Sequence, residues 1–265
     1  VCLGPALGLT PNGLSGQAPD EAWRTIKTEH FRVTFPERLE MLGRKAADRS
    51  EWAWLALSEH FIDPPDGIID VLVTDHADVS NGFAQLRPSN RITVYARPPT
   101  DLLSLGHVDE WLELVITHEL THIVHLDLVR NAIGRSVRAV FGRIQGDWPF
   151  FPELGTPRWV IEGLATWYES RLTQAGRVRG TYEEMQIRTA IIENRFENIG
   201  QASGDGPLWP GGNRAYAYGS LFFEFLLTRH GEDGLAAFVE AIAGQWIPYR
   251  IDAAGRDAFG DSLSD

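Results

Sequence analysis

The chain contains a single cysteine, Cys2, among its 265 residues. One thiol excludes an internal disulfide and any metal site built from several thiolates. Basic residues are also scarce, because 24 Lys and Arg accompany 36 Asp and Glu, for a formal net charge of -12. This imbalance argues against a nucleic-acid or anionic-membrane partner, since both need a basic surface. Outside the charged segment 111–129, no apolar run reaches the roughly 18 residues of a membrane span.

Apolar residues are plentiful, at 43% of the chain with 9 Trp and 13 Phe. This composition predicts a sizeable core in one large domain or in two small lobes that share a cleft. Residues 1–9 are largely apolar, and Gly16 and Ala18 place small side chains where a signal peptidase reads them. We therefore interpret residues 1–19 as a signal-peptide remnant and linker, and expect an exported protein of a bacterial periplasm or the extracellular space. An ordinary disordered terminus is the alternative.

The order of the expected elements predicts an α+β fold. Alternation of apolar and polar residues predicts strands, and a helical spacing predicts one helix, in the first part of the chain: strands 30–35, 68–74, 83–84 and 91–96, and helix 37–61. Helical spacing predominates afterwards, at 112–129, 159–170, 182–193, 216–229 and 235–243. We expect an N-terminal α/β lobe over 20–105, with a small mixed sheet and an edge strand, and a helical lobe over 106–265.

The two lobes are expected to form one unit with the functional cleft between them. Residues 131–157 are rich in Gly, Pro and aromatic residues and show no clear period, so we interpret them as an irregular connector along the cleft wall.

Residues 118–122 read His-Glu-Leu-Thr-His within an apolar helical segment. Two histidines four positions apart lie on one face of a helix, so His118 and His122 can both reach one Zn²⁺ ion at about 2.0–2.1 Å. Glu119 lies one position further round and can touch a water molecule at an open position of the ion. An accidental match on a solvated helix face is the alternative, and the apolar surroundings disfavour it.

A catalytic zinc site needs a third protein ligand. His125 is a poor candidate, because His118 and His125 are about 10 Å apart along a straight helix; we expect His125 to pack beside the site. Glu162 lies in the apolar helix 159–170, where a desolvated carboxylate needs a cation or hydrogen-bond donors. The sequence therefore predicts one Zn²⁺ ion bound by His118, His122 and Glu162. The alternative is a rim glutamate paired with Arg158 or Arg171.

His118-Glu119-x-x-His122, followed by Trp159-x-x-Glu162-Gly-Leu-Ala, resembles the gluzincin zinc metallopeptidases, which include thermolysin-like and aminopeptidase N-like enzymes. The likeness from residue 30 to 259 is to the peptidase MA-like domain of bacterial exported proteins. The resemblance implies a thermolysin-like fold, one zinc ion, and a peptide or protein substrate. That domain is often followed by a β-propeller, so a C-terminal propeller in the full-length protein is a further implication.

Ala215-Tyr216-Ala217-Tyr218-Gly219 resembles the Tyr-x-Lys-Gly segment of the aminopeptidase N-like family, with Tyr218 in place of Lys. The resemblance implies that Tyr216 stabilises the tetrahedral intermediate, and Tyr218 is the fallback donor. From spacing alone, an aromatic residue at the start of an apolar helix most often belongs to the core.

Residues 83–86, or alternatively residues 92–96, are expected to form an edge strand that pairs with an extended peptide, and Gly82, Phe83 and Ala84 are the expected substrate-binding residues. The aminopeptidase segment Gly-Ala-Met-Glu-Asn, whose Glu holds the substrate's amino terminus, has no counterpart here. We therefore expect an endopeptidase rather than an aminopeptidase. The alternatives are a catalytically silent, zinc-containing peptide-binding module, which would have no use for Glu119, and a zinc hydrolase of a non-peptide bond.

Overall fold

A computed structural model of the chain describes residues 20–100, 108–143, 150–204 and 209–263. The expected signal-peptide remnant, residues 1–19, lies outside these ranges, and so does the expected lobe boundary at residues 105 and 106.

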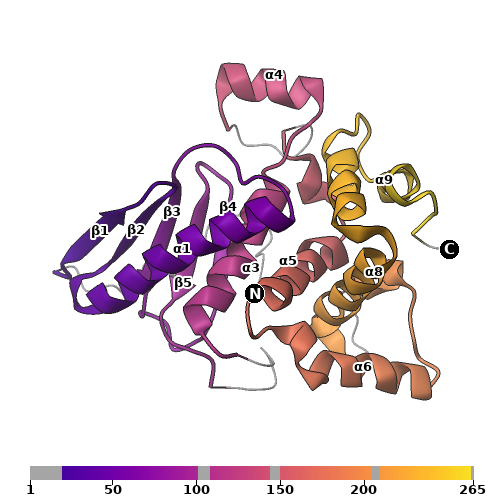
Figure 1. Ribbon diagram of the computed structural model, residues 1–265, viewed down its shortest axis with the longest axis horizontal. Coiled ribbons are helices and arrows are strands. Elements are labelled where there is room, and N and C mark those ends of the chain that lie inside the picture. Colours follow the sequence, from indigo (N-terminus) through magenta and orange to yellow (C-terminus); the bar gives the residue numbers. More distant parts are fainter. Residues whose placement is uncertain (1–19, 101–107, 144–149, 205–208, 264–265) are drawn as a thin grey trace.

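Five strands form one mixed sheet in the order β1-β2-β3-β5-β4 (Figure 1). They are β1 (Trp23–Lys27), β2 (Phe31–Pro36), β3 (Ile69–Thr74), β4 (Gly82–Gln85) and β5 (Arg91–Tyr95). The central pairs β2–β3 and β3–β5 are parallel, whereas β1–β2 and β4–β5 are antiparallel. The prediction of an edge strand at residues 92–96 is wrong, because β5 pairs with β3 on one side and with β4 on the other. Strand β4 lies at one edge of the sheet and β1 at the other. Strand β1 was not expected from the sequence.

One face of the sheet is buried and the other is mostly polar, as the alternation in the strands predicts. Val33, Val71 and Val94 are fully buried or nearly so, on neighbouring strands. Helices α1 (Glu40–His60) and α3 (Trp111–Leu126) contact the sheet, α1 against β1, β2 and β3 and α3 against β4 and β5. They also contact each other, and in Figure 1 both lie along the sheet. The edge strand β4 is therefore directly beside α3.

The second half of the described chain is helical. Its larger helices are α5 (Arg158–Leu172), α6 (Thr181–Ile192), α8 (Arg214–Ala243) and α9 (Ile251–Phe259), and the short α7 spans Ile199–Ala202. Helix α8 is interrupted at Gly231, whose φ of 74° and ψ of 178° are not helical. The two helices expected at 216–229 and 235–243 correspond to its two halves. Among the described residues, no helix is long and apolar enough to cross a membrane.

The expectation of an irregular connector over 131–157 is wrong in part, because α4 occupies Ala132–Phe141. The Asn131 side chain caps this helix by accepting a hydrogen bond from the backbone amide of Gly134 at 2.7 Å. Its apolar residues recur at helical spacing, but Val140 and Phe141 are exposed, and α4 stands away from the body in Figure 1. The sequence signal of this short helix is weakened by Gly134 within it and Gly142 at its end. The α+β class itself is confirmed.

Candidate metal centre

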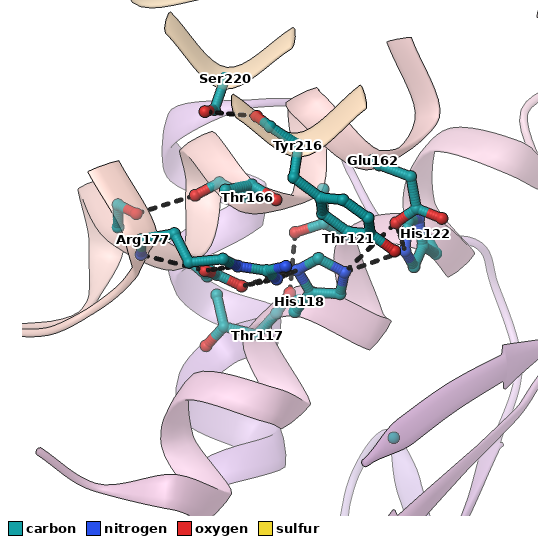
Figure 2. A network of polar contacts seen from close by, with 12 residues as sticks. Thr117, His118, Thr121, His122, Glu162, Thr166, Arg177, Tyr216 and Ser220 are labelled. Carbon is teal, nitrogen blue, oxygen red and sulfur yellow. Dashed lines mark hydrogen bonds and ion pairs between the residues drawn. The ribbon is translucent and has the colours of Figure 1, made fainter. Parts of the chain in front are cut away.

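Three side chains from two helices meet at one point of the core (Figure 2). His118 and His122 come from consecutive turns of α3, and Glu162 comes from α5, which packs across α3. The two histidine Nε2 atoms are 3.1 Å apart. Glu162 Oε2 lies 3.5 Å from His122 Nε2 and 3.8 Å from His118 Nε2. The sequence-predicted ligand set is therefore brought together by the fold.

The spacing of these donors suits a single tetrahedral ion. Ligand atoms about 2.0–2.1 Å from one zinc ion, at tetrahedral angles, are separated by about 3.3 Å. The three sides of the observed triangle are 3.1, 3.5 and 3.8 Å. Two imidazole Nε2 atoms and a carboxylate oxygen are also the donor types that zinc prefers. The chemistry and the spacing of this set fit a zinc ion.

The side chains of this ligand set are buried, which supports a metal site over a surface ion pair. His118 and His122 are 1% exposed, and Glu119 and Glu162 are not exposed at all. Glu162 is therefore not a rim residue, which removes the alternative of a surface ion pair. Among the described residues, neither carboxylate oxygen of Glu162 has a hydrogen-bond partner. The Nε2 atoms of His122 and His118 lie close by, and although burial opposes ionisation, these two histidines lower the pKa of Glu162. A buried carboxylate held in the ionised form is stabilised further by a cation.

Glu119 lies between the ligands and the edge strand. Its two carboxylate oxygens are also without hydrogen-bond partners among the described residues. Burial is the main reason that the pKa of Glu119 is raised above its ordinary value. A Cβ placed on Gly82 of β4 would lie 3.1 Å from Glu119 Oε1 and 2.5 Å from Val115 Cγ2. Glycine at position 82 thus lets β4 approach the Glu119 carboxylate, with the expected substrate-binding residues Phe83 and Ala84 following it in the strand.

Tyr216 extends from α8 towards the cluster, with its hydroxyl near Glu162 and the two histidines (Figure 2). A backbone contact between α5 and α8 brings it there. A Cβ on Gly163 would lie 2.5 Å from the carbonyl carbon of Gly219, and one on Gly219 would lie 2.3 Å from the carbonyl oxygen of Trp159. Burial, and then the charge of Glu162, raise the pKa of Tyr216.

Tyr218 faces another part of the molecule. Its ring stacks on Phe196 with centroids 5.3 Å apart, and its hydroxyl is 3.5 Å from the backbone amide of Glu197. Two positions along a helix turn a side chain by about 200°, so only one of the two tyrosines can face Glu162. The structure places Tyr216 beside the cluster and Tyr218 outside it.

The ring nitrogen of His118 that faces away from the ligand cluster, Nδ1, contacts Glu169, a partner that the sequence analysis did not predict. His118 Nδ1 lies 2.7 Å from Glu169 Oε2, and Glu169 is fully buried. When Nδ1 carries the proton, it donates a hydrogen bond to Glu169. The lone pair of His118 Nε2 is then directed towards His122 and Glu162. Glu169 follows Glu162 by two helical turns, so the shared face of α5 was a signal that could have found it.

His125 lies away from the cluster and contacts a different carboxyl group. Its Nε2 is 2.9 Å from Oε2 of Glu153, which belongs to the 3-10 turn Pro152–Gly155, and both side chains are fully buried. Burial lowers the pKa of His125 to about 3 and raises the pKa of Glu153 well above its ordinary value. His125 is thus held by a neighbouring turn, in keeping with the expectation that it packs beside the site.

No family model matches the sequence, and no curated protein matches it. The solved structures to which the chain is similar include the following two. An M1 zinc metallopeptidase from Deinococcus radiodurans has a TM-score of 0.48 and 16% identity, covering 89% of this chain and 47% of its own. Native yeast LTA4 hydrolase has a TM-score of 0.45 and 15% identity, covering 83% of this chain and 33% of its own. The chain thus spans less than half of either neighbour, and neither a family nor an activity follows from likenesses this distant.

Proposed function

We propose that this protein is a zinc-dependent peptidase, with endopeptidase rather than aminopeptidase activity. The triangle of His118, His122 and Glu162 donors is the observation that carries the proposal. Glu119 adds the second requirement, a buried carboxylate beside the donors that is not engaged elsewhere among the described residues. A purely structural metal site has no use for such a group.

In this proposal His118, His122 and Glu162 hold the ion. Zinc in a site with three protein ligands acts as a Lewis acid and makes a water molecule acidic enough to ionise near neutral pH. Glu119 accepts the proton of the attacking water and passes it to the leaving amine. Its raised pKa suits this role, because proton transfer is most effective when the pKa of the group lies near the working pH.

Tyr216 and β4 complete the site. The Tyr216 hydroxyl donates a hydrogen bond to the oxygen on which negative charge develops as the carbonyl is attacked. Strand β4, with Gly82, Phe83 and Ala84, has an edge that no other described strand pairs with, and this edge binds an extended peptide by strand addition, close to Glu119. Strand addition holds a peptide along its length rather than by its terminus, which favours cleavage within a chain.

Other parts of the proposal rest on the sequence alone. These are export to a bacterial periplasm or the extracellular space, the division into lobes at residues 20–105 and 106–265 with a cleft between them, and a β-propeller after the peptidase domain.

The test combines metal analysis with cleavage of casein and of a peptide library. We expect about one zinc per chain, cleavage that a chelator abolishes and zinc restores, and new termini within the peptides. Zinc without cleavage favours the silent binding module, and cleavage of esters or other bonds but no peptides favours the non-peptide hydrolase. Release of single amino-terminal residues would contradict the endopeptidase assignment.

Tyr216 and Tyr218 form a matched pair of variants for the same assay. Tyr216→Phe removes the proposed oxyanion donor, and losing one such donor typically lowers turnover by about 10²–10³. KM should change little, because this hydrogen bond strengthens in the transition state. Tyr218→Phe should be nearly silent, since its hydroxyl lies beside Glu197. The reverse pattern would show that the donor is Tyr218.

A further inference from the structure

A buried arginine contacts the side chains that surround the candidate metal centre. Arg177, in the 3-10 turn Arg177–Arg179 between α5 and α6, is 2% exposed. Its Nε and Nη2 atoms donate to the two carboxylate oxygens of Glu169, each at 2.8 Å, and its backbone amide donates to Glu169 Oε1 at 3.2 Å. Glu169 is the carboxylate that contacts His118. The arginine therefore clamps the group that orients a proposed metal ligand.

The same guanidinium also contacts the proposed oxyanion donor. Its central carbon lies 4.7 Å from the centre of the Tyr216 ring, in the arrangement of a cation–π contact. Its Nη2 atom is 3.2 Å from His118 Nδ1. Figure 2 shows the guanidinium group of Arg177 reaching His118, with the ring of Tyr216 close by. One side chain from a short turn thus touches both halves of the site.

We propose that Arg177 is a positioning residue that sets the orientation of His118 through Glu169 and that of Tyr216 through its ring. The proposal rests on the peptidase function proposed above. A guanidinium fork bound to both carboxylate oxygens fixes the plane of Glu169, and so the direction in which His118 Nδ1 donates. Its flat face supports the Tyr216 ring, which holds the hydroxyl beside Glu162. In this proposal Arg177 does not touch the substrate or the metal ion, and it acts through its contacts with Glu169, His118 and Tyr216.

Stability alone is a poor explanation for a buried ion pair at this place. Desolvation of two charges costs about as much as their attraction returns, and apolar residues of similar volume often give equal or greater stability. What apolar residues cannot provide is a directed contact with a carboxylate and an aromatic face together. Lysine would keep the charge but would lose both the fork and the flat face. Arg177→Lys therefore separates charge from geometry.

The experiment compares Arg177→Lys and Arg177→Met with Arg179→Lys as a matched control. Arg179 is exposed, belongs to the same turn, and donates to the backbone oxygen of Ser170. We expect Arg177→Met to lower zinc affinity about 10–100-fold in competition with a chelator, the usual cost of losing support for a ligand. We expect Arg177→Lys to retain the wild-type melting temperature but to recover only part of this affinity, and Arg179→Lys to behave as wild type.

Kinetics test the contact with Tyr216. Both Arg177 variants should lower kcat with little change in KM, and the loss should be smaller in a Tyr216→Phe background, since coupled residues are not additive. The absorption spectrum of the cobalt-substituted protein should shift in both variants, because His118 is reoriented.

Two results would overturn the proposal. The first is wild-type zinc affinity and cobalt spectrum in a folded Arg177→Met or Arg177→Lys protein. The second is a loss of kcat that tracks the loss of melting temperature and is fully restored by lysine. If the wild-type protein cleaves no peptide, the peptidase function fails, while zinc affinity and the cobalt spectrum still decide whether Arg177 orients His118.

Discussion

Helix α3 carries two histidine–glutamate contacts that look alike and differ in charge. His118 Nδ1 is 2.7 Å from Glu169, and two turns further along His125 Nε2 is 2.9 Å from Glu153. All four side chains are buried. Glu169 is also held by Arg177, which adds a full positive charge at 2.8 Å. Among the described residues, Glu153 has no such cation within salt-bridge distance, and His125 is its only ionisable contact there.

The third partner decides the charge state. Burial tends to raise the pKa of Glu169, but Arg177 and His118 outweigh burial and hold that pKa at about 2. Glu153 has only burial acting on it, so its pKa is raised well above the ordinary value. The first contact is therefore an anchored negative charge that supports a metal ligand. The second is a pair that holds a single proton and serves packing.

The largest effect is expected from Glu119, a carboxylate of α3 that has no hydrogen-bond partner among the described residues. Glu119→Gln keeps the shape of the side chain and removes the base, so cleavage should fall by about 10²–10⁴. Zinc content and melting temperature should stay near those of the wild type, because Glu119 is not among the proposed ligands. Cleavage by this variant at the wild-type rate would mean that Glu119 is not the base.

Two substitutions test whether the His118–Glu169 and His125–Glu153 contacts differ in their effect on zinc affinity. Glu169→Gln replaces the anchored charge, and we expect zinc affinity to fall about 10–100-fold in a chelator competition. Glu153→Gln makes the same chemical change at the second contact and should leave zinc affinity unchanged. Equal losses in the two variants would show that both contacts support the metal centre alike.

The smallest effect is a pH dependence of folding stability from His125 and Glu153. In the folded metal-free protein the pair holds one proton, because the pKa of His125 is about 3 and that of Glu153 is well above its ordinary value. In the unfolded chain the pair holds two protons below about pH 4.3, one up to about pH 6.5, and none above that. Its contribution to stability is therefore greatest between these two pH values. It declines on either side by at most about 1.4 kcal/mol per pH unit.

Chemical denaturation of the wild-type protein and of Glu153→Gln, each at a series of pH values, measures the contribution of Glu153 to this pH dependence. The difference in the free energy of unfolding should decrease as the pH rises above about 4.3, where the unfolded carboxyl group ionises and the buried one does not. A difference that stays constant from pH 5 to pH 8 would indicate that Glu153 is ionised in the folded protein.

Local geometry was enough to predict much of this molecule. Helical periodicity places His118, Glu119 and His122 on adjoining positions of one helix, whatever surrounds that helix. Strand alternation predicts β2, β3 and β5 because one face of each is buried. Glu162 could be singled out since a carboxylate in a helix that is apolar over most of its surface needs a compensating partner. Each inference uses only residues within a few turns or strand positions of one another.

The remainder depended on contacts between distant parts of the chain. The sheet order that puts β4 rather than β5 at the edge, and the approach of Gly163 to Gly219 that turns Tyr216 and not Tyr218 towards Glu162, follow from how the elements pack. The sequence separates His118 from His125 by their positions in the motif, but it does not show which carboxylate contacts each histidine. Arg177 lies 59 positions from His118 and Glu153 lies 28 positions from His125. Charge and burial act through space, so only the tertiary structure decided which histidine has an anchored carboxylate and which shares a single proton.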